Sequence, residues 1–140
     1  VGRLRARHPE VDAKGAMAAW SAPSGEIDRE ALALVQAVRE RAPVALVTNA
    51  TDRLDADLAR LGVRDAFDHI VNSWAVGAAK PDRAIYDHAL ALVDADAGEA
   101  LYIDDTERYL GPAARLGLRC HHYRGADGLS DVLVAHGLIA

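Results

Sequence analysis

The sequence has 140 residues, 51% of them hydrophobic and 26% charged, with a formal net charge of −5. This length suits one domain, and the negative charge argues against nucleic-acid partners, which require a basic surface. No apolar run approaches the roughly 20 residues of a membrane helix, and no signal-peptide core opens the chain, so we expect a cytoplasmic protein without membrane partners.

The first 27 residues differ in pattern from the rest. Pro9–Trp20 are predicted to form a helix, and the Pro and Gly within Ser21–Gly25 are expected to end it. We therefore place a domain boundary between a small helical piece, residues 1–27, and an α/β body, residues 28–140.

From residue 28 onward, short apolar runs alternate with amphipathic stretches. The runs predict four buried parallel strands: Val44–Val47, His69–Val71, Leu101–Ile103 and Leu118–Tyr123. Five helices are predicted to begin at Asp28, at Thr51 or Asp52, at Pro81, at Thr106 and at about Ser130. Such an alternation predicts a parallel sheet with right-handed crossovers and helices on both faces.

Three polar clusters are predicted to lie at the carboxyl ends of these strands or at the start of a following helix. They are Thr48-Asn49-Ala50-Thr51, Lys80-Pro81 and Asp104-Asp105-Thr106. Ligands of parallel α/β sheets collect at the carboxyl edge. Free backbone N–H groups and a lysine can bind an anion there, and paired carboxylates can hold a hard cation.

Each cluster also has a purely structural interpretation. Thr48 could cap the next helix, and Lys80 could be solvated, although a cation is unfavourable near a helix N-terminus. Asp104 and Asp105 could also cap a helix, although adjacent carboxylates repel each other unless a cation offsets them.

Three segments, in chain order, resemble motifs two, three and four of the haloacid dehalogenase (HAD) superfamily of hydrolases. They are Val44–Asn49, Val76–Pro81 and Leu101–Thr106. The resemblance covers residues 28–124 and implies a Rossmann-like three-layer parallel sheet. Residues 1–27 resemble the rear half of the family's small helical cap, and the family's first, central strand has no counterpart in this prediction.

The resemblance also implies roles for individual residues. Thr48 and the Asn49 backbone would bind phosphoryl oxygens, and Lys80 would neutralise the phosphate and hold the nucleophile. Asp105 would be the magnesium ligand, with Asp104 supporting it. The acidic pair favours a magnesium-dependent phosphatase, acting on a small phosphorylated molecule, over a metal-free dehalogenase.

The family's nucleophile, the first Asp of an Asp-x-Asp-x-Thr/Val motif after the central strand, has no counterpart before Thr48. Asp55-Ala-Asp57 and Asp94-Ala-Asp96 share the spacing, but they are predicted in a helix and in a loop. Tyr109 stands where the family has a further metal-site Asp or Asn, so magnesium is expected to bind weakly or not at all. We expect this chain alone to be inactive; the alternative is a non-catalytic HAD-core binding protein that has lost its nucleophile.

Without a central strand, the strands ending at Thr48 and Asp104 would face each other across an open slot. Such a slot costs about 1–3 kcal/mol for each unpaired backbone group, so we expect either direct pairing of the two strands or a homodimer through the exposed edges. Histidine is not expected to bind metal, because His121 and His122 point to opposite faces of a strand.

Overall fold

The computed structural model describes residues 15–19 and 29–139. Its strands form one five-stranded parallel sheet in the order β3-β2-β1-β4-β5. The strands are β1 (Gly15–Ala19), β2 (Val44–Thr48), β3 (His69–Asn72), β4 (Ala100–Asp104) and β5 (Arg119–His122). The α-helices are α2 (Arg29–Arg39), α3 (Leu54–Leu61), α4 (Ser73–Val76), α5 (Arg83–Val93), α6 (Leu110–Arg115) and α7 (Ala126–Ala135). Short 3-10 turns are η2 (Arg64–Ala66), η3 (Ala97–Glu99) and η4 (Glu107–Tyr109).

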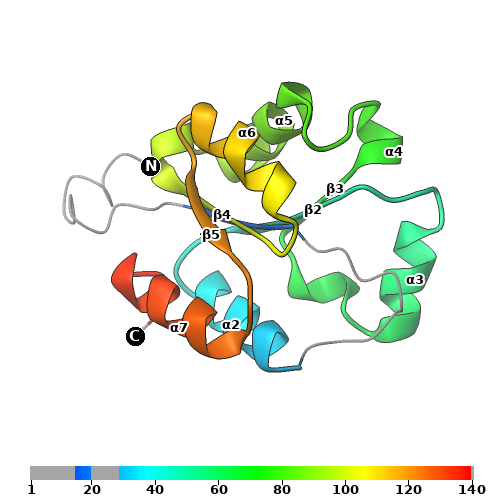
Figure 1. Cartoon of the computed structure of the whole chain (residues 1–140). Helices are drawn as coiled ribbons and strands as arrows, with labels where there is room; N and C mark the ends of the chain where they lie inside the picture. The colour runs from blue at the N-terminus through cyan, green and yellow to red at the C-terminus, as the bar shows by residue number, and fades with distance from the viewer. Residues whose placement is uncertain (1–14, 20–28, 140) are drawn as a thin grey trace.

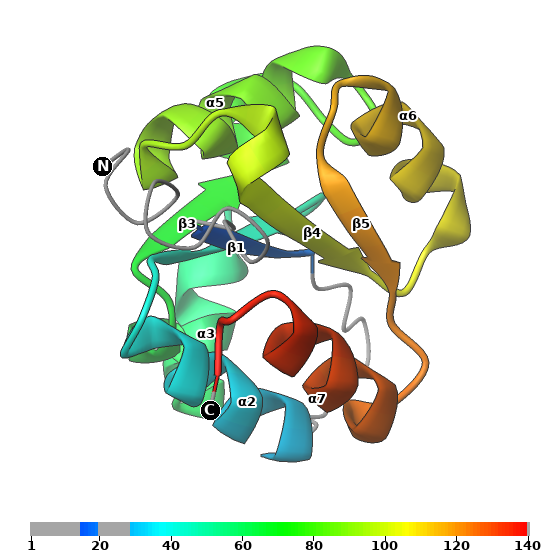
Figure 2. The same ribbon diagram turned by 90° about the vertical axis from the view of Figure 1, so that its left-hand side faces the viewer.

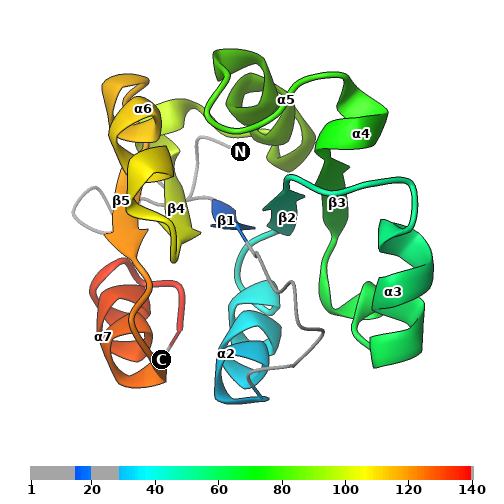
Figure 3. The same ribbon diagram turned by 45° about the vertical axis from the view of Figure 1, so that its right-hand side comes forward.

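Helices cover both faces of the sheet, which confirms the predicted three-layer α/β fold (Figure 1, Figure 2). Helices α2, α3 and α7 lie on one face, and α4, α5 and α6 lie on the other (Figure 3). No helix in residues 15–19 and 29–139 is long and apolar enough to cross a membrane.

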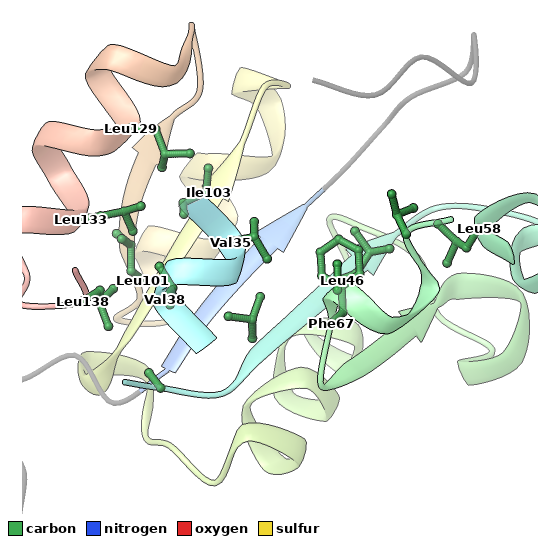
Figure 4. Packing of buried hydrophobic residues seen from close by; sticks show 14 residues of the cluster. Val35, Val38, Leu46, Leu58, Phe67, Leu101, Ile103, Leu129, Leu133 and Leu138 are labelled. Atoms are coloured by element: carbon green, nitrogen blue, oxygen red, sulfur yellow. The ribbon is translucent and has the colours of Figure 1, made fainter. Parts of the chain in front are cut away.

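The hydrophobic core is divided into two clusters by the sheet. One cluster joins α2 and α7 to β2 and β4 through residues such as Val38, Leu46, Leu101 and Leu133 (Figure 4). The other packs Ile85 and further residues of α5 against the opposite face. Because side chains alternate along a strand, the residues next to Leu101 and Ile103 in β4, Tyr102 and Asp104, belong to the α5 face.

The expectation that the sheet lacks a central strand is wrong, because β1 occupies the central position. Its residues pair with β2, where Ala18 lies opposite Leu46, and with β4, where Ala18 lies opposite Ile103. The helix predicted over Pro9–Trp20 is therefore wrong for Gly15–Ala19, and this segment belongs to the α/β sheet rather than to a separate cap remnant. The rest of the predicted cap, residues 1–14 and 20–27, lies outside the described residues.

Filling the slot removes the reason for expecting the strands before Thr48 and Asp104 to pair directly. It also closes the route to a homodimer through facing central edges. The edges that remain open in the described sheet belong to its outer strands, β3 and β5.

The other predicted strands are found, each within one residue of its expected limits. Helix α3 ends as expected at Gly62, whose φ of 74° is left-handed. Helix α5 begins at Arg83 rather than at Pro81, and α7 begins at Ala126, four residues before Ser130. The helix predicted from Thr106 begins as the turn η4 and continues as α6.

Candidate functional site at the carboxyl edge of the sheet

The three polar clusters meet at the carboxyl edge of the sheet. Asn49, just after β2, contacts Lys80, and Lys80 contacts Asp104 at the end of β4. Segments far apart in sequence thus converge because parallel strands end at the same edge.

An ion pair lies at the centre of the cluster. Lys80 Nζ is 3.2 Å from Asp104 Oδ2, and the two side chains are only 1% and 0% exposed. The interpretation of Lys80 as a solvated lysine is therefore wrong. The Thr106 N–H donates to Asp104 Oδ1 at 2.9 Å, so Asp104 also acts as a local backbone cap.

Two buried tyrosines support the ion pair from the α5 face. Tyr102 shares its face of β4 with Asp104 and donates its hydroxyl hydrogen to Asp104 Oδ2. Burial, and then the bond to Asp104, raise the pKa of Tyr102 far above its usual value. Tyr86 packs edge-on against Tyr102 with ring centroids 5.3 Å apart, and burial raises its pKa to about 12. Both phenols therefore stay protonated hydrogen-bond donors at neutral pH.

The Asn49 side chain binds the backbone of Lys80 at two points. The Lys80 N–H donates to Asn49 Oδ1 at 2.8 Å, and Asn49 Nδ2 donates to the Lys80 carbonyl at 3.1 Å. This amide fixes the position of the Lys80 backbone relative to the end of β2. The sequence predicted that the Asn49 backbone binds phosphate, and it did not reveal this role of the side chain.

Tyr109 lies in the cluster, beside Lys80 and Asn49, but its contacts there are not ones that the sequence predicts. Its buried ring lies 4.9 Å from Lys80 Nζ and 5.0 Å from Arg108 Cζ, measured to the ring centroid. Its hydroxyl oxygen accepts hydrogen bonds from Arg108 Nη2 at 3.0 Å and from Asn49 Nδ2 at 3.3 Å. Tyr86 donates to its backbone carbonyl at 3.0 Å. The Tyr109 ring thus lies between two cations, Lys80 and Arg108, at a position where the resembled motif has Asp or Asn.

Asp105 is exposed, unlike its buried neighbour Asp104. The two adjacent carboxylates therefore lie in different environments. The Thr106 hydroxyl donates to Asp105 Oδ1 at 3.2 Å, and the Asp105 carbonyl contacts His122 Nε2 at 3.1 Å. Arg124 Nε donates to the other ring nitrogen, His122 Nδ1, at 3.2 Å. Since an arginine N–H only donates and a carbonyl only accepts, these partners place the His122 proton on Nε2.

The donor set for magnesium is incomplete in the described residues. Both oxygens of Asp104 already accept hydrogen bonds from Lys80, Tyr102 and Thr106. Within residues 15–19 and 29–139, no three His, Cys, Asp or Glu side chains are grouped as a metal site. Asp105 is thus the one exposed carboxylate of the predicted pair, and one carboxylate without substrate phosphates is a poor magnesium site. The described residues therefore do not fit a complete magnesium centre.

Thr48 lies at the predicted place but outside this contact network. It is buried at the end of β2, opposite Asn72 of β3. No hydrogen bond within the described part of the chain joins its side chain to Lys80 or Asp104.

The two Asp-Ala-Asp sequences are structural, as expected. On α3, Asp55 and Asp57 lie near Arg64 and Arg60, at 3.6 and 3.9 Å. Asp94 ends α5, and Asp96 forms a capping box at η3.

Comparisons with known proteins agree with the fold and with the family resemblance. Residues 3–117 match the family model of haloacid dehalogenase-like hydrolases. The chain is 34% identical over 116 residues to the pyrimidine 5'-nucleotidase YjjG of Escherichia coli, covering 77% of this chain and 52% of the relative. It is 33% identical over 92 residues to the human haloacid dehalogenase-like hydrolase domain-containing protein 3, covering 64% and 36%. The chain thus spans about half, or less, of the length of these curated relatives.

Solved structures share the fold. A protein from Corynebacterium glutamicum superposes with a TM-score of 0.78 at 19% identity, covering 91% of this chain and 97% of that one. A HAD family enzyme from Bacteroides thetaiotaomicron, solved as a complex with magnesium and inorganic phosphate, gives a TM-score of 0.63 at 25% identity, covering 70% and 53%. With the parallel sheet and its three ordered motifs, these matches identify the class: the chain belongs to the haloacid dehalogenase-like hydrolase family.

Proposed function

We propose that the carboxyl edge of this sheet is the phosphoryl-binding part of a HAD-type phosphate-ester hydrolase. The observation that carries the proposal is the buried Lys80–Asp104 pair, with exposed Asp105 beside it, at the edge where ligands of such sheets bind. A buried lysine fixed by a carboxylate and an amide is a preorganised positive group, which suits a reaction that depends on electrostatic stabilisation of phosphoryl oxygens.

Two relatives support phosphate esters as the substrate class. The Escherichia coli relative is a pyrimidine 5'-nucleotidase, and the Bacteroides enzyme binds magnesium and inorganic phosphate. We propose the same substrate class, a small phosphate monoester, for a protein that contains this chain together with the carboxylates that this chain lacks. In such a protein Thr48 and Asn49 would face the phosphate, and Asp105 would contribute to a magnesium site.

The 140-residue chain alone is expected to bind but not to hydrolyse. Covalent phosphoryl transfer needs a carboxylate oxygen to attack phosphorus while the ester oxygen leaves. The residues that follow β1 in the sequence are Trp20, Ser21 and Ala22, and the first carboxylate after them is Glu26. No Asp-x-Asp sequence stands between β1 and Thr48 to supply this carboxylate.

A second candidate is a non-catalytic binding protein with a HAD core. The observation that favours it is β1 itself: the chain fills the central position with its own strand, and no Asp-x-Asp follows that strand. The DNA upstream of the Val1 codon discriminates between the two candidates. An open frame that encodes a strand followed by Asp-x-Asp-x-Thr indicates an enzyme.

The experiment compares the 140-residue chain with the product of the complete open frame that contains it, using p-nitrophenyl phosphate and nucleoside monophosphates with magnesium. We expect no turnover from the chain. We expect turnover from the longer product, reduced about a hundredfold or more by Lys80→Met because an electrostatic contact to the transition state is lost. Magnesium-dependent hydrolysis by the chain itself, abolished by Asp105→Ala, would contradict the inactivity. A longer product that is inactive and lacks the motif would establish the second candidate.

A further inference from the structure

The ring of Tyr109 is held in place by contacts that do not involve the Lys80 side chain. Tyr86, on α5, donates its hydroxyl hydrogen to the Tyr109 carbonyl at 3.0 Å, which fixes the backbone. At the other end of the residue, the Tyr109 hydroxyl oxygen accepts hydrogen bonds from Asn49 Nδ2 at 3.3 Å and from Arg108 Nη2 at 3.0 Å. Tyr109 is therefore anchored at both ends, and the position of its ring does not depend on the lysine.

The Lys80 ammonium group lies against this ring, with Nζ 4.9 Å from the ring centroid. An ammonium group has three N–H groups, yet among the described residues Nζ donates only one hydrogen bond, to Asp104 Oδ2 at 3.2 Å. Tyr102 donates to the same oxygen. Solvent reaches almost none of the Lys80 side chain, which is 1% exposed, and an aromatic face attracts a cation most strongly where water is excluded. The ring is thus the second group, after Asp104, that stabilises the buried ammonium.

The ring also separates the ion pair from the surface. Asn49 and Arg108, which fix the hydroxyl end of Tyr109, are both exposed, whereas Tyr109 and Lys80 are buried. A phenol ring attracts a cation without adding a negative charge, so the positive charge of Lys80 is balanced by Asp104 alone. The ring can therefore orient the ammonium and exclude water from it without neutralising it further.

We propose that Tyr109 is a positioning residue whose ring face holds the Lys80 ammonium beside Asp104 and shields this ion pair from water. The inference rests on the proposed function for the task of Lys80, and it adds the residue that orients this lysine. What Lys80 requires at position 109 is then the aromatic ring, and neither the hydroxyl group nor the volume of an apolar side chain replaces it.

The first test measures the protection of Lys80 in the 140-residue chain, whose only lysines are Lys14 and Lys80. Reductive methylation with formaldehyde and cyanoborohydride, followed by peptide mass spectrometry, gives a separate labelling rate for Lys80. Tyr109→Phe keeps the ring, and the Lys80 rate is expected to stay within about twofold of that in the unsubstituted chain. Tyr109→Leu and Tyr109→Met remove the ring, and each is expected to raise the rate about tenfold. Phe67→Leu is the control, because it removes a buried ring from the other core cluster, and it is expected to leave the Lys80 rate within about twofold.

A double-mutant cycle separates the effect of the ring on the charge from its packing. Urea denaturation gives the ratio of the unfolding equilibrium constants of Tyr109→Leu and Tyr109→Phe, once with Lys80 and once with Lys80→Met. This ratio is expected to be about fivefold larger with Lys80, because only then does the ring act on a cation. If Tyr109→Leu does not fold, Tyr109→Met takes its place. Equal ratios, or Lys80 labelling in Tyr109→Phe as fast as in the variants without a ring, would overturn the inference. Neither measurement involves phosphate or turnover, so a failure of this inference is distinguished from a failure of the proposed function.

Discussion

Lys80 and Asp104 form an ion pair with almost no exposure, although 24 residues separate them in the sequence. Removing one partner leaves an uncompensated buried charge, which costs about 3–5 kcal/mol. Lys80→Met is therefore expected to lower the free energy of unfolding by about 3 kcal/mol or more, measured by urea denaturation.

The double variant Lys80→Met/Asp104→Asn is expected to be more stable than Lys80→Met alone. Asparagine removes the unpaired charge and can still form hydrogen bonds with Tyr102 and Thr106. If the double variant were less stable than the single one, the ion pair would not be the reason for the loss.

Tyr102 and Tyr86 form a matched pair for measuring the hydrogen bond to Asp104. Both are fully buried, and Phe preserves either ring. The Tyr102 hydroxyl donates to a carboxylate and the Tyr86 hydroxyl to a carbonyl. Tyr102→Phe is expected to cost about 1.5–3 kcal/mol and Tyr86→Phe about 1 kcal/mol, because hydrogen bonds to charged groups are stronger. Equal losses in urea denaturation would contradict the charged state of Asp104.

His121 predicts a pH dependence of stability. Its Nε2 atom is buried and has no hydrogen-bond partner among the residues that the structure describes. Burial, followed by the nearby His122 and His136, lowers the pKa of His121 below its usual 6.5. The unfolded chain then binds a proton more readily than the folded one. The free energy of unfolding is therefore expected to fall as the pH drops below about 6.5, until the pH lies below the folded pKa.

The variant His121→Leu is expected to have a flatter profile of unfolding free energy between pH 7 and about pH 5. His88→Gln serves as the control, because His88 is exposed on α5 and its loss should leave the slope as it was. A His121→Leu profile parallel to that of the unsubstituted chain would show that His121 does not titrate differently on folding.

The central strand gives a test of the topology. Ala18 pairs with both neighbouring strands, and proline cannot donate to a strand ladder. Ala18→Pro is expected to break the strand pairing at the centre of the sheet and so to cause unfolding or self-association. Circular dichroism measures the unfolding, and light scattering measures the self-association. A monomeric variant with the original urea midpoint would mean that Gly15–Ala19 does not form the central strand.

The strands rich in β-branched or aliphatic residues could be predicted from the sequence, because their runs end at turn signals. Segment Gly15–Ala19 could not, since its sequence Gly-Ala-Met-Ala-Ala lacks β-branched residues and contains helix formers. Its strand conformation depends on pairing with two neighbours, which is a tertiary effect.

The site could be predicted in part. The convergence of Lys80 and Asp104 follows from the strand order, and alternation along β4 explains why Asp104 is buried with Tyr102. The role of Tyr109 could not be predicted, because it depends on how η4 turns back towards Asn49 and Lys80. The hydrogen bonding of both Asp104 oxygens likewise could not be predicted from the sequence, because the donors come from Lys80, Tyr102 and Thr106.

The two hydrogen bonds between the Asn49 side chain and the Lys80 backbone have a mechanical consequence. The Asn49 amide bonds both the N–H and the C=O of Lys80, as a neighbouring strand would in a sheet. The loop before α5 is therefore held to the end of β2. A ligand that draws Lys80 outward must therefore carry the β2 loop with it. The Lys80 amide proton should exchange with solvent as slowly as those of the core strands, and Asn49→Ala should let it exchange through local opening.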